Sequence, residues 1–177
     1  TRLPLLCALA TEVGLGDANY LEVQDRQSSA VGSLSLSVST RASRDSVDSA
    51  SGYLVTSSKA LANRIPDQVS LMTDTLTKAT FKETGRIKEL ISQMRARRDQ
   101  SISGAGHSLA MTAASAGMSA LATLYHSQSG LAGIASLRAL DNSLSDATAL
   151  SELSAELSSL RDVLITSHSV NLLTVSD

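Results

Sequence analysis

Residues 92–113 read SQMRARRDQSISGAGHSLAMTA and join two helices of opposite character. The first is strongly basic near its end, and the second is rich in Ala, Ser and Gly, which allows close packing against neighbours. Just before and within this stretch, apolar residues recur at i, i+3, i+4 and i+7, which predicts one buried helix face. They are Ile87, Leu90, Ile91 and Met94.

Gly104 and Gly106 lie where these two helices meet, so we expect an antiparallel or sharply bent helix pair there. Valine at either position is expected to cost about 1–3 kcal/mol, through strain at a turn or overpacking.

His107 and the arginines Arg95, Arg97 and Arg98 are the candidate functional residues of this corner. His107 has no Cys, Asp or Glu close in sequence to activate it, which favours a helix-start residue over a catalytic base. The arginines favour a solvated or partner-facing helix end. Nucleic acid is not expected as a partner, because the net charge is -2 and the chain has one Phe and no Trp for base stacking.

The composition suits one domain of 177 residues with a core of Leu, Ala, Val and Ile, since aromatic residues make up only 2%. The single cysteine, Cys7, excludes an internal disulfide and a zinc-finger type of site. It lies in an apolar run and is expected to be buried and inert. No apolar run approaches the roughly 20 residues that span a bilayer, so no membrane is expected as a partner.

Alternating apolar and polar residues predict an α+β fold, with a sheet whose helices pack mainly on one face. In the first predicted strand, 33–41, Leu34, Leu36 and Val38 alternate with serines. A second strand is predicted at 52–58 and forms an antiparallel pair with the first across a polar loop. A third, at 170–176, is expected to return to the sheet, which should nevertheless look incomplete.

The remaining chain is predicted to be helical. Pro4 suits the first turn of a helix over 3–13, and Asn19 with Glu22 has the spacing of a capping box. A long helix is expected over 108–127, a short one over 130–141, and a last one capped by Ser145. In the helix that Pro66 begins, the residues expected on the buried face are Ile65, Val69, Met72 and Leu76. In the last helix, the leucines expected to pack in the core are Leu150, Leu153, Leu157, Leu160 and Leu164.

Motifs for catalysis are missing from the sequence. The three histidines, at 107, 126 and 168, are widely spaced, and no pair lies three or four residues apart with a Glu. There is no phosphate-binding glycine loop and no nucleophile elbow. A stand-alone hydrolase that uses His107 or His126 with a serine therefore has no support from spacing, and the residues alone indicate a non-catalytic chain.

Several phrases, in their order and spacing, resemble the pitrilysin/insulinase family of zinc metallopeptidases, most closely its presequence-protease branch. The resemblance covers nearly the whole chain. The phrases are LPLL at 3–6, EVG at 12–14, the helix of 20–32 that leads into the strand at 33–41, MRAR at 94–97 and SGAGHSLA at 103–110.

The resemblance implies one half of a two-half, clamshell-shaped peptidase that encloses a peptide. The zinc-bearing half of such proteins ligates the metal through a His-x-x-Glu-His helix and a distant Glu. With Gly14 placed on the glycine that follows this helix, the ligand positions fall on Leu5, Ala8 and Leu9, and the distant Glu falls near Glu83 or Glu89. The chain thus resembles the start of the non-catalytic second half, and no catalytic, cofactor-binding or metal residue is expected in it.

The same resemblance sets the expected partners and cofactors. Residues 1–177 would be a single inactive, truncated half-domain cut from a longer, bacterial polypeptide, since the chain begins at Thr1 on what reads as a first helical turn. Zinc is expected in the missing catalytic half. The expected partners are that N-terminal half and, in the full protein, a peptide substrate, and a homodimer of the fragment is conceivable. The alternative is an independent helical protein-interaction module, although the strand at 33–41 argues against a pure helical bundle.

Overall fold

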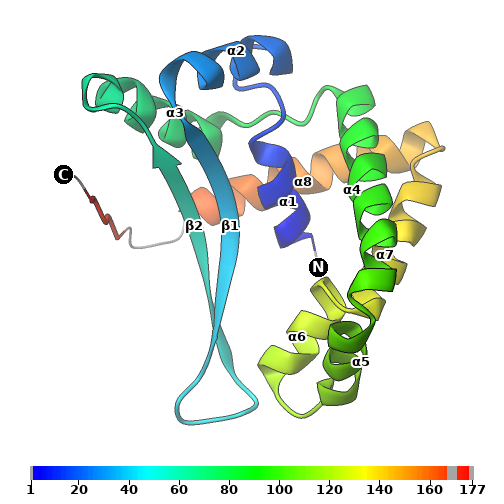
Figure 1. Cartoon of the computed structure of the whole chain (residues 1–177). Coiled ribbons are helices and arrows are strands. Elements are labelled where there is room, and N and C mark those ends of the chain that lie inside the picture. The colour runs from blue at the N-terminus through cyan, green and yellow to red at the C-terminus, as the bar shows by residue number, and fades with distance from the viewer. Residues whose placement is uncertain (1, 167–170, 176–177) are drawn as a thin grey trace.

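The computed structural model describes residues 2–166 and 171–175. It has the expected α+β fold, in which a long two-stranded antiparallel ribbon stands beside a set of helices (Figure 1). In chain order the elements are α1 Leu3–Ala10, α2 Tyr20–Ala30, β1 Ser33–Ala42, β2 Ala50–Lys59, a 3₁₀ turn at Ala62–Arg64, α3 Ile65–Lys78, α4 Thr84–Gly104, α5 Gly106–Ser115, α6 Ala120–Gln128, α7 Leu131–Ser143 and α8 Ala147–Thr166.

The ribbon keeps the predicted alternation. Leu34 and Leu36 are partly buried and pack against the core, whereas Ser35 and Ser37, which alternate with them, are exposed. Strand β1 pairs with β2 in continuous register from Ser33 opposite Lys59 to Ala42 opposite Ala50. The helices α1 and α6 approach β1, and α3 approaches β2. One face of the ribbon is therefore covered in part, and the turn at its far end lies beside α6 (Figure 1), where Val47 O accepts a hydrogen bond from Ala120 N at 2.9 Å.

The predicted third strand is absent from the described residues 171–175, which have no regular structure, while residues 170 and 176 lie outside the described part. Leu172, Leu173 and Val175 are almost fully exposed there. The prediction was wrong for these five residues, because apolar alternation produces a strand only where a sheet edge pairs with it.

Local signals placed several helices correctly. Pro4 lies in the first turn of α1, and both hydrogen bonds of the Asn19–Glu22 capping box form at the start of α2. On α4, Ile87 and Ile91 are fully buried. On α8, Leu157 is fully buried, Leu153 is nearly so, and the other three leucines of the stripe pack against the core, as expected.

The helix predicted over 108–127 is two helices, α5 and α6, in the structure. Gly117 adopts a left-handed backbone conformation with φ 88° between them, and Ser119 caps α6 by accepting a hydrogen bond from Ala122 N at 3.1 Å. The cap of α8 also differs from the expectation. Asp146, rather than Ser145, accepts a hydrogen bond, from Thr148 N at 2.9 Å.

The buried face of α3 was predicted only in part, since Met72 and Leu76, two of the four residues expected there, are half-buried. Ile65 and Val69 are 50% and 56% exposed, and the buried residues of this helix are Leu71 and Thr75. Helix α3 contacts β2, which precedes it closely in the chain, and also α2 and α8, which are distant in sequence, so residues outside the helix set the surface it buries. The Thr75 hydroxyl donates to Leu71 O at 2.8 Å, which lets a polar residue occupy the buried face.

No helix in the described ranges is long and apolar enough to cross a membrane.

The corner between α4 and α5 lies at Ala105, where the chain changes direction (Figure 1). Neither Gly104 nor Gly106 has a positive φ, and a Cβ at either position would meet no atom within 4 Å. The expected strain or overpacking is therefore absent at both glycines, and the predicted loss on valine substitution has no basis there.

Gly14 is one of the glycines that the packing requires, because a Cβ there would lie 2.5 Å from the Ala18 carbonyl oxygen. We predict that Gly14→Ala lowers the free energy of unfolding by about 1–3 kcal/mol through this backbone clash. The control, Gly104→Ala, should be neutral or stabilising by up to about 1 kcal/mol, since alanine favours helix. Urea unfolding measures both changes, and equal stability of the two variants would contradict the packing argument.

Candidate functional site

Helix α1 carries the three positions where the resemblance places zinc ligands. Leu9 is fully buried in the core, Leu5 is half-buried and packs against it, and Ala8 is exposed. None of these side chains has an atom that can ligate a metal. In the residues that the structure describes, no group of three or more His, Cys, Asp or Glu side chains is arranged to hold a metal ion.

Cys7 lies on the same helix and is buried, as expected from its apolar surroundings. Burial raises the pKa of its thiol to about 11, although a backbone hydrogen bond lowers it in part. The thiolate, which is the reactive and metal-binding form, is therefore disfavoured at neutral pH.

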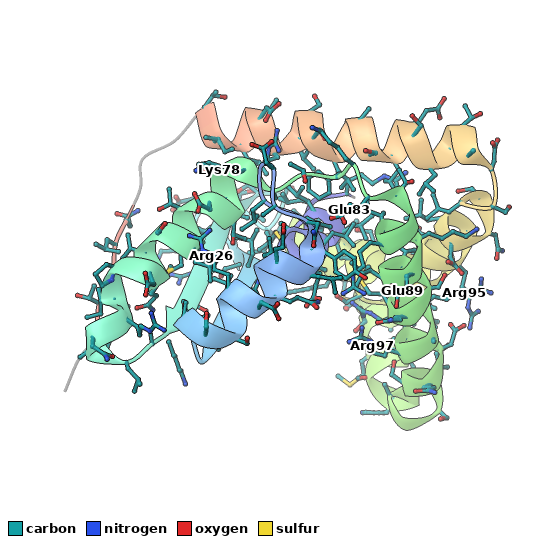
Figure 2. All side chains as sticks on the ribbon, turned by 90° about the horizontal axis from the view of Figure 1, so that it is seen from above. Arg26, Lys78, Glu83, Glu89, Arg95 and Arg97 are labelled. Atoms are coloured by element: carbon teal, nitrogen blue, oxygen red, sulfur yellow. The ribbon has the colours of Figure 1, made fainter. Side chains whose placement is uncertain are left out.

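Glu83, the first candidate for the distant Glu, is engaged at the junction between α2 and α4. Its carboxylate accepts a hydrogen bond from the Tyr20 backbone N–H at 3.1 Å, and Figure 2 shows Glu83 near the start of α4. A carboxylate at this N-terminal end of α2 satisfies one of its free backbone donors. The structure thus gives Glu83 a structural role.

Glu89, the second candidate, pairs with Arg86, the central residue of a small ionic cluster. The Arg86 guanidinium donates to Glu89 at 3.0 Å and to Glu12 at 3.2 Å, and it lies 4.7 Å from the centre of the Tyr20 ring. Its side chain is only 13% exposed. This cluster ties the end of α1 to α2 and α4, and sequence spacing gave no sign of it because Glu12 and Arg86 are 74 residues apart.

The arginine cluster of α4 divides in the structure. Arg95 donates to Asp141 at 2.8 Å and to Asn142 at 2.7 Å, so it joins α4 to the end of α7. Arg97 bonds only within α4, to Gln93, and Arg98 is exposed. Figure 2 shows Arg95 and Arg97 pointing away from each other. Arg95 is therefore a packing residue, and only the other two match the predicted solvated helix end.

The histidines do not form a common site in the described residues. His107 is exposed on α5, and His126 is half-buried near the end of α6, where its Nδ1 has no hydrogen-bond partner among the residues that the structure places. His168 lies outside the described residues. The prediction that this chain contains no catalytic, cofactor-binding or metal residue remains a prediction.

A groove of about 520 Å³ opens between α1, α6 and the ribbon, within the size range of ligand sites. We call it the α1–β1 groove. Its lining residues are Pro4, Cys7, Ala8, Leu36, Ser37, Val38, Ser39, Thr40, Tyr125, Gln128 and Ser129. One of the three ligand positions, Ala8, therefore faces a hollow, where a methyl group replaces a metal-binding side chain. Sequence reasoning did not find this groove, since its walls come from three separate segments.

Comparison of the sequence with known proteins gives a family match. The family described as peptidase M-16C associated matches residues 1–140. The chain belongs to this family. It is 28% identical over 129 residues to a protein of Danio rerio named "Presequence protease, mitochondrial", a match that covers 73% of this chain and 13% of that protein. It is also 28% identical over 108 residues to "Presequence protease 1, chloroplastic/mitochondrial" of Arabidopsis thaliana, which covers 61% of this chain and 10% of that protein.

This peptidase-associated chain is thus related to the presequence-protease branch of the pitrilysin/insulinase family, as its phrases indicated. It spans about an eighth of the length of the zebrafish relative. Both relatives are eukaryotic, so they give no support to the expected bacterial source.

We predict that Arg86→Ala lowers the free energy of unfolding by about 2 kcal/mol, because it leaves Glu12 without its ionic partner and removes the cation–π contact. Arg86→Lys should show a smaller loss, since lysine keeps the charge but not the fork of donors. The matched control on the same helix is Arg97→Ala, which should change stability by less than about 0.5 kcal/mol. Chemical denaturation compares the three variants, and an equal effect of the two alanine variants would refute the role of the cluster.

Asp141 makes stability depend on pH. The Ser92 hydroxyl, 2.6 Å away, and Arg95 hold the pKa of this carboxyl below its usual value. Its contribution is complete above the unfolded pKa of about 4 and is lost as pH falls through the lower folded pKa. We therefore predict that the stability difference between the parent and Asp141→Asn narrows below about pH 4, in urea melts from pH 7 to pH 2. In a Ser92→Ala background the narrowing should be smaller, and a difference independent of pH would contradict the assignment.

Proposed function

We propose that this chain is a non-catalytic domain of a zinc-dependent peptidase, which forms part of the wall of a peptide-enclosing chamber and packs against the zinc-bearing half of the same polypeptide. The observation that most directly supports the proposal is which side chains α1 has at the ligand positions. In a chain of this peptidase-associated family, the helix at the ligand positions presents Leu5, Ala8 and Leu9 and buries Leu9 completely. A buried leucine stabilises the domain core, whereas a ligand would have to reach an open cavity.

Two further features support the proposal. The acidic residues at the distant ligand position are engaged, Glu83 with the backbone of Tyr20 and Glu89 with Arg86. Large apolar side chains also lie exposed along β2, the segment that follows it and α3, which favours a domain that packs against a further part of a longer chain. They are Tyr53, Leu54, Val55, Leu61, Ile65 and Val69.

The zinc and the peptide substrate in this proposal are inferred from the family relationship. Both would belong to the complete polypeptide, with zinc bound by its other half. The residues at the ligand positions of this chain cannot ligate a zinc ion, so they have no catalytic role in the proposal. A homodimer of the isolated chain would be a consequence of uncovered apolar surface, and sedimentation measures it directly.

The proposal predicts that the purified chain, dialysed against chelator and then supplied with zinc, neither retains stoichiometric zinc nor cleaves a fluorogenic peptide. The zinc-bearing segment of the parent polypeptide, expressed separately, should bind this chain and gain chelator-sensitive peptidase activity when the chain is added. Elemental analysis, sedimentation and the cleavage assay give the three readouts. The matched control is the parent segment with its zinc-ligating His-x-x-Glu-His residues changed to alanine, which should bind the chain and stay inactive.

Zinc bound in a 1:1 ratio by the chain alone, together with chelator-sensitive cleavage, would overturn the proposal. So would a zinc-bearing segment that neither binds the chain nor responds to it, since an independent interaction module would behave in that way.

A further inference from the structure

The α1–β1 groove runs along the outer edge of strand β1. Five consecutive residues of this strand, 36–40, line the groove, and no residue of β2 does so. Side chains of a strand alternate between the two faces of a sheet, so a hollow on one face would be lined by every second residue. A hollow lined by consecutive residues on one strand only must follow the edge that faces away from β2. In Figure 1 this edge lies on the side of α1 and α6.

The backbone groups at this edge can be assigned from the register. Ser43 N donates to Ser49 O at 3.1 Å, and these residues lie opposite each other when the β1–β2 register is extended by one pair. Hydrogen-bonded pairs alternate along an antiparallel ladder, so the odd-numbered residues of β1 bond to β2. The N–H and C=O groups of Leu36, Val38 and Thr40 therefore point into the groove. In the described part of the chain, no backbone hydrogen bond outside the ladder involves residues 36–40.

The walls of the groove carry no formal charge. Helix α1 contributes Pro4, Cys7 and Ala8, and the other wall includes Tyr125 and Gln128 of α6. None of the eleven lining residues is Lys, Arg, His, Asp or Glu. A charged ligand would lose hydration here without gaining an ionic partner, whereas a neutral main chain needs the amide donors and acceptors that an open strand edge supplies.

We propose that the α1–β1 groove binds an extended, uncharged segment of peptide, which adds to β1 as a third strand. The inference rests on the proposed function, because it makes this domain a peptide-holding wall of the chamber. Main-chain hydrogen bonds to Leu36, Val38 and Thr40 provide affinity, and the side chains of the peptide alternate between the ribbon's two faces. This groove is lined by residues of β1 and by none of β2, so the two edges of the ribbon can be compared in the test.

The test uses the 177-residue chain and a fluorescein-labelled peptide of about six residues, alternating Val and Ser, with blocked ends. Saturable binding in fluorescence polarisation is expected. Val38→Pro removes one donor that points into the groove and should weaken binding about tenfold. Leu54→Pro is the matched control, because Leu54 lies directly opposite Val38 in the ladder and its N–H points to the other edge. It should leave the affinity unchanged, and thermal melts identify any variant that is unfolded.

A second pair of variants leaves the strand backbone intact. Ala8→Phe fills the groove from an exposed position of α1 and should also weaken binding about tenfold. Ala110→Phe places the same ring on an exposed position of α5 outside the groove and should have no effect. Two N-methylated peptides provide a further test, one methylated at its odd-numbered residues and the other at its even-numbered residues. One of them should not bind and the other should bind normally, because only every second N–H of an added strand faces β1.

Failure of the peptide to bind the folded parent chain at millimolar concentration would overturn the inference. Binding that survives both Val38→Pro and Ala8→Phe would do the same, as would a dimer of the chain that occupies β1 and is not displaced by peptide. These readouts need neither zinc nor the catalytic half. A failure here therefore leaves the proposed function standing, and a failure to complement the zinc-bearing segment leaves peptide binding measurable.

Discussion

The fold depends on a backbone junction between two loops that are far apart in sequence. Gly14 O accepts a hydrogen bond from Thr80 N at 2.8 Å, and Gly16 N donates to Lys78 O at the same distance. Between these bonds, Leu15 forms a β-bridge with Ala79, and both residues are buried. Because buried amides must be paired, the junction fixes the end of α1 against the end of α3. A Cβ at Gly14 would clash with the Ala18 carbonyl oxygen of its own loop, and it would also lie 3.2 Å from the Thr80 hydroxyl of the other loop.

Helix α8 and the ionic cluster then build on this junction. The hydroxyl of Ser154 donates to Phe81 O, and the Arg161 guanidinium donates to Ala79 O, so α8 closes over the loop that follows α3. On the other side, Arg86 joins Glu12 and Tyr20. Polar groups around a core of Leu, Val, Ile and one Phe thus hold α1 in a single orientation, with Leu9 inward and Ala8 toward the groove. This orientation determines which side chains of α1 face the core and which face the groove.

The sequence was informative where structure depends on near neighbours. The capping box of Asn19 and Glu22, the apolar face of α4 and the leucine stripe of α8 are all set by residues three or four positions apart. Predictions from the sequence failed where packing against residues distant in sequence determines which side chains are buried. Val69 has the right spacing for a buried face, but α3 turns Leu71 and Thr75 inward against partners that no local pattern encodes. The break between α5 and α6 had a local signal, because Gly117 is followed two residues later by the cap residue Ser119. The apolar pattern on both sides of this signal nevertheless suggested one continuous helix.

The same distinction explains the candidate site. Spacing alone excluded a histidine-based motif, and the resemblance placed Leu5, Ala8 and Leu9 at the ligand positions. Neither could reveal that Arg95 is paired with Asp141, 46 residues away, or that α1, β1 and α6 enclose a groove.

The ion pairs of this domain and the α1–β1 groove occupy different parts of its surface. The ion pairs that join elements, Arg86 with Glu12 and Arg95 with Asp141, lie at helix junctions, where they stabilise packing and are already satisfied. The residues that line the groove carry no formal charge, and within the described part of the chain the outward main-chain donors and acceptors of β1 make no backbone hydrogen bond. Natural proteins usually protect a strand edge with charged residues or proline, and from Leu34 to Thr40 this edge has neither. An edge left open yet partly enclosed by two helices admits a single extended chain and hinders the approach of a whole sheet, so it is suited to peptide binding.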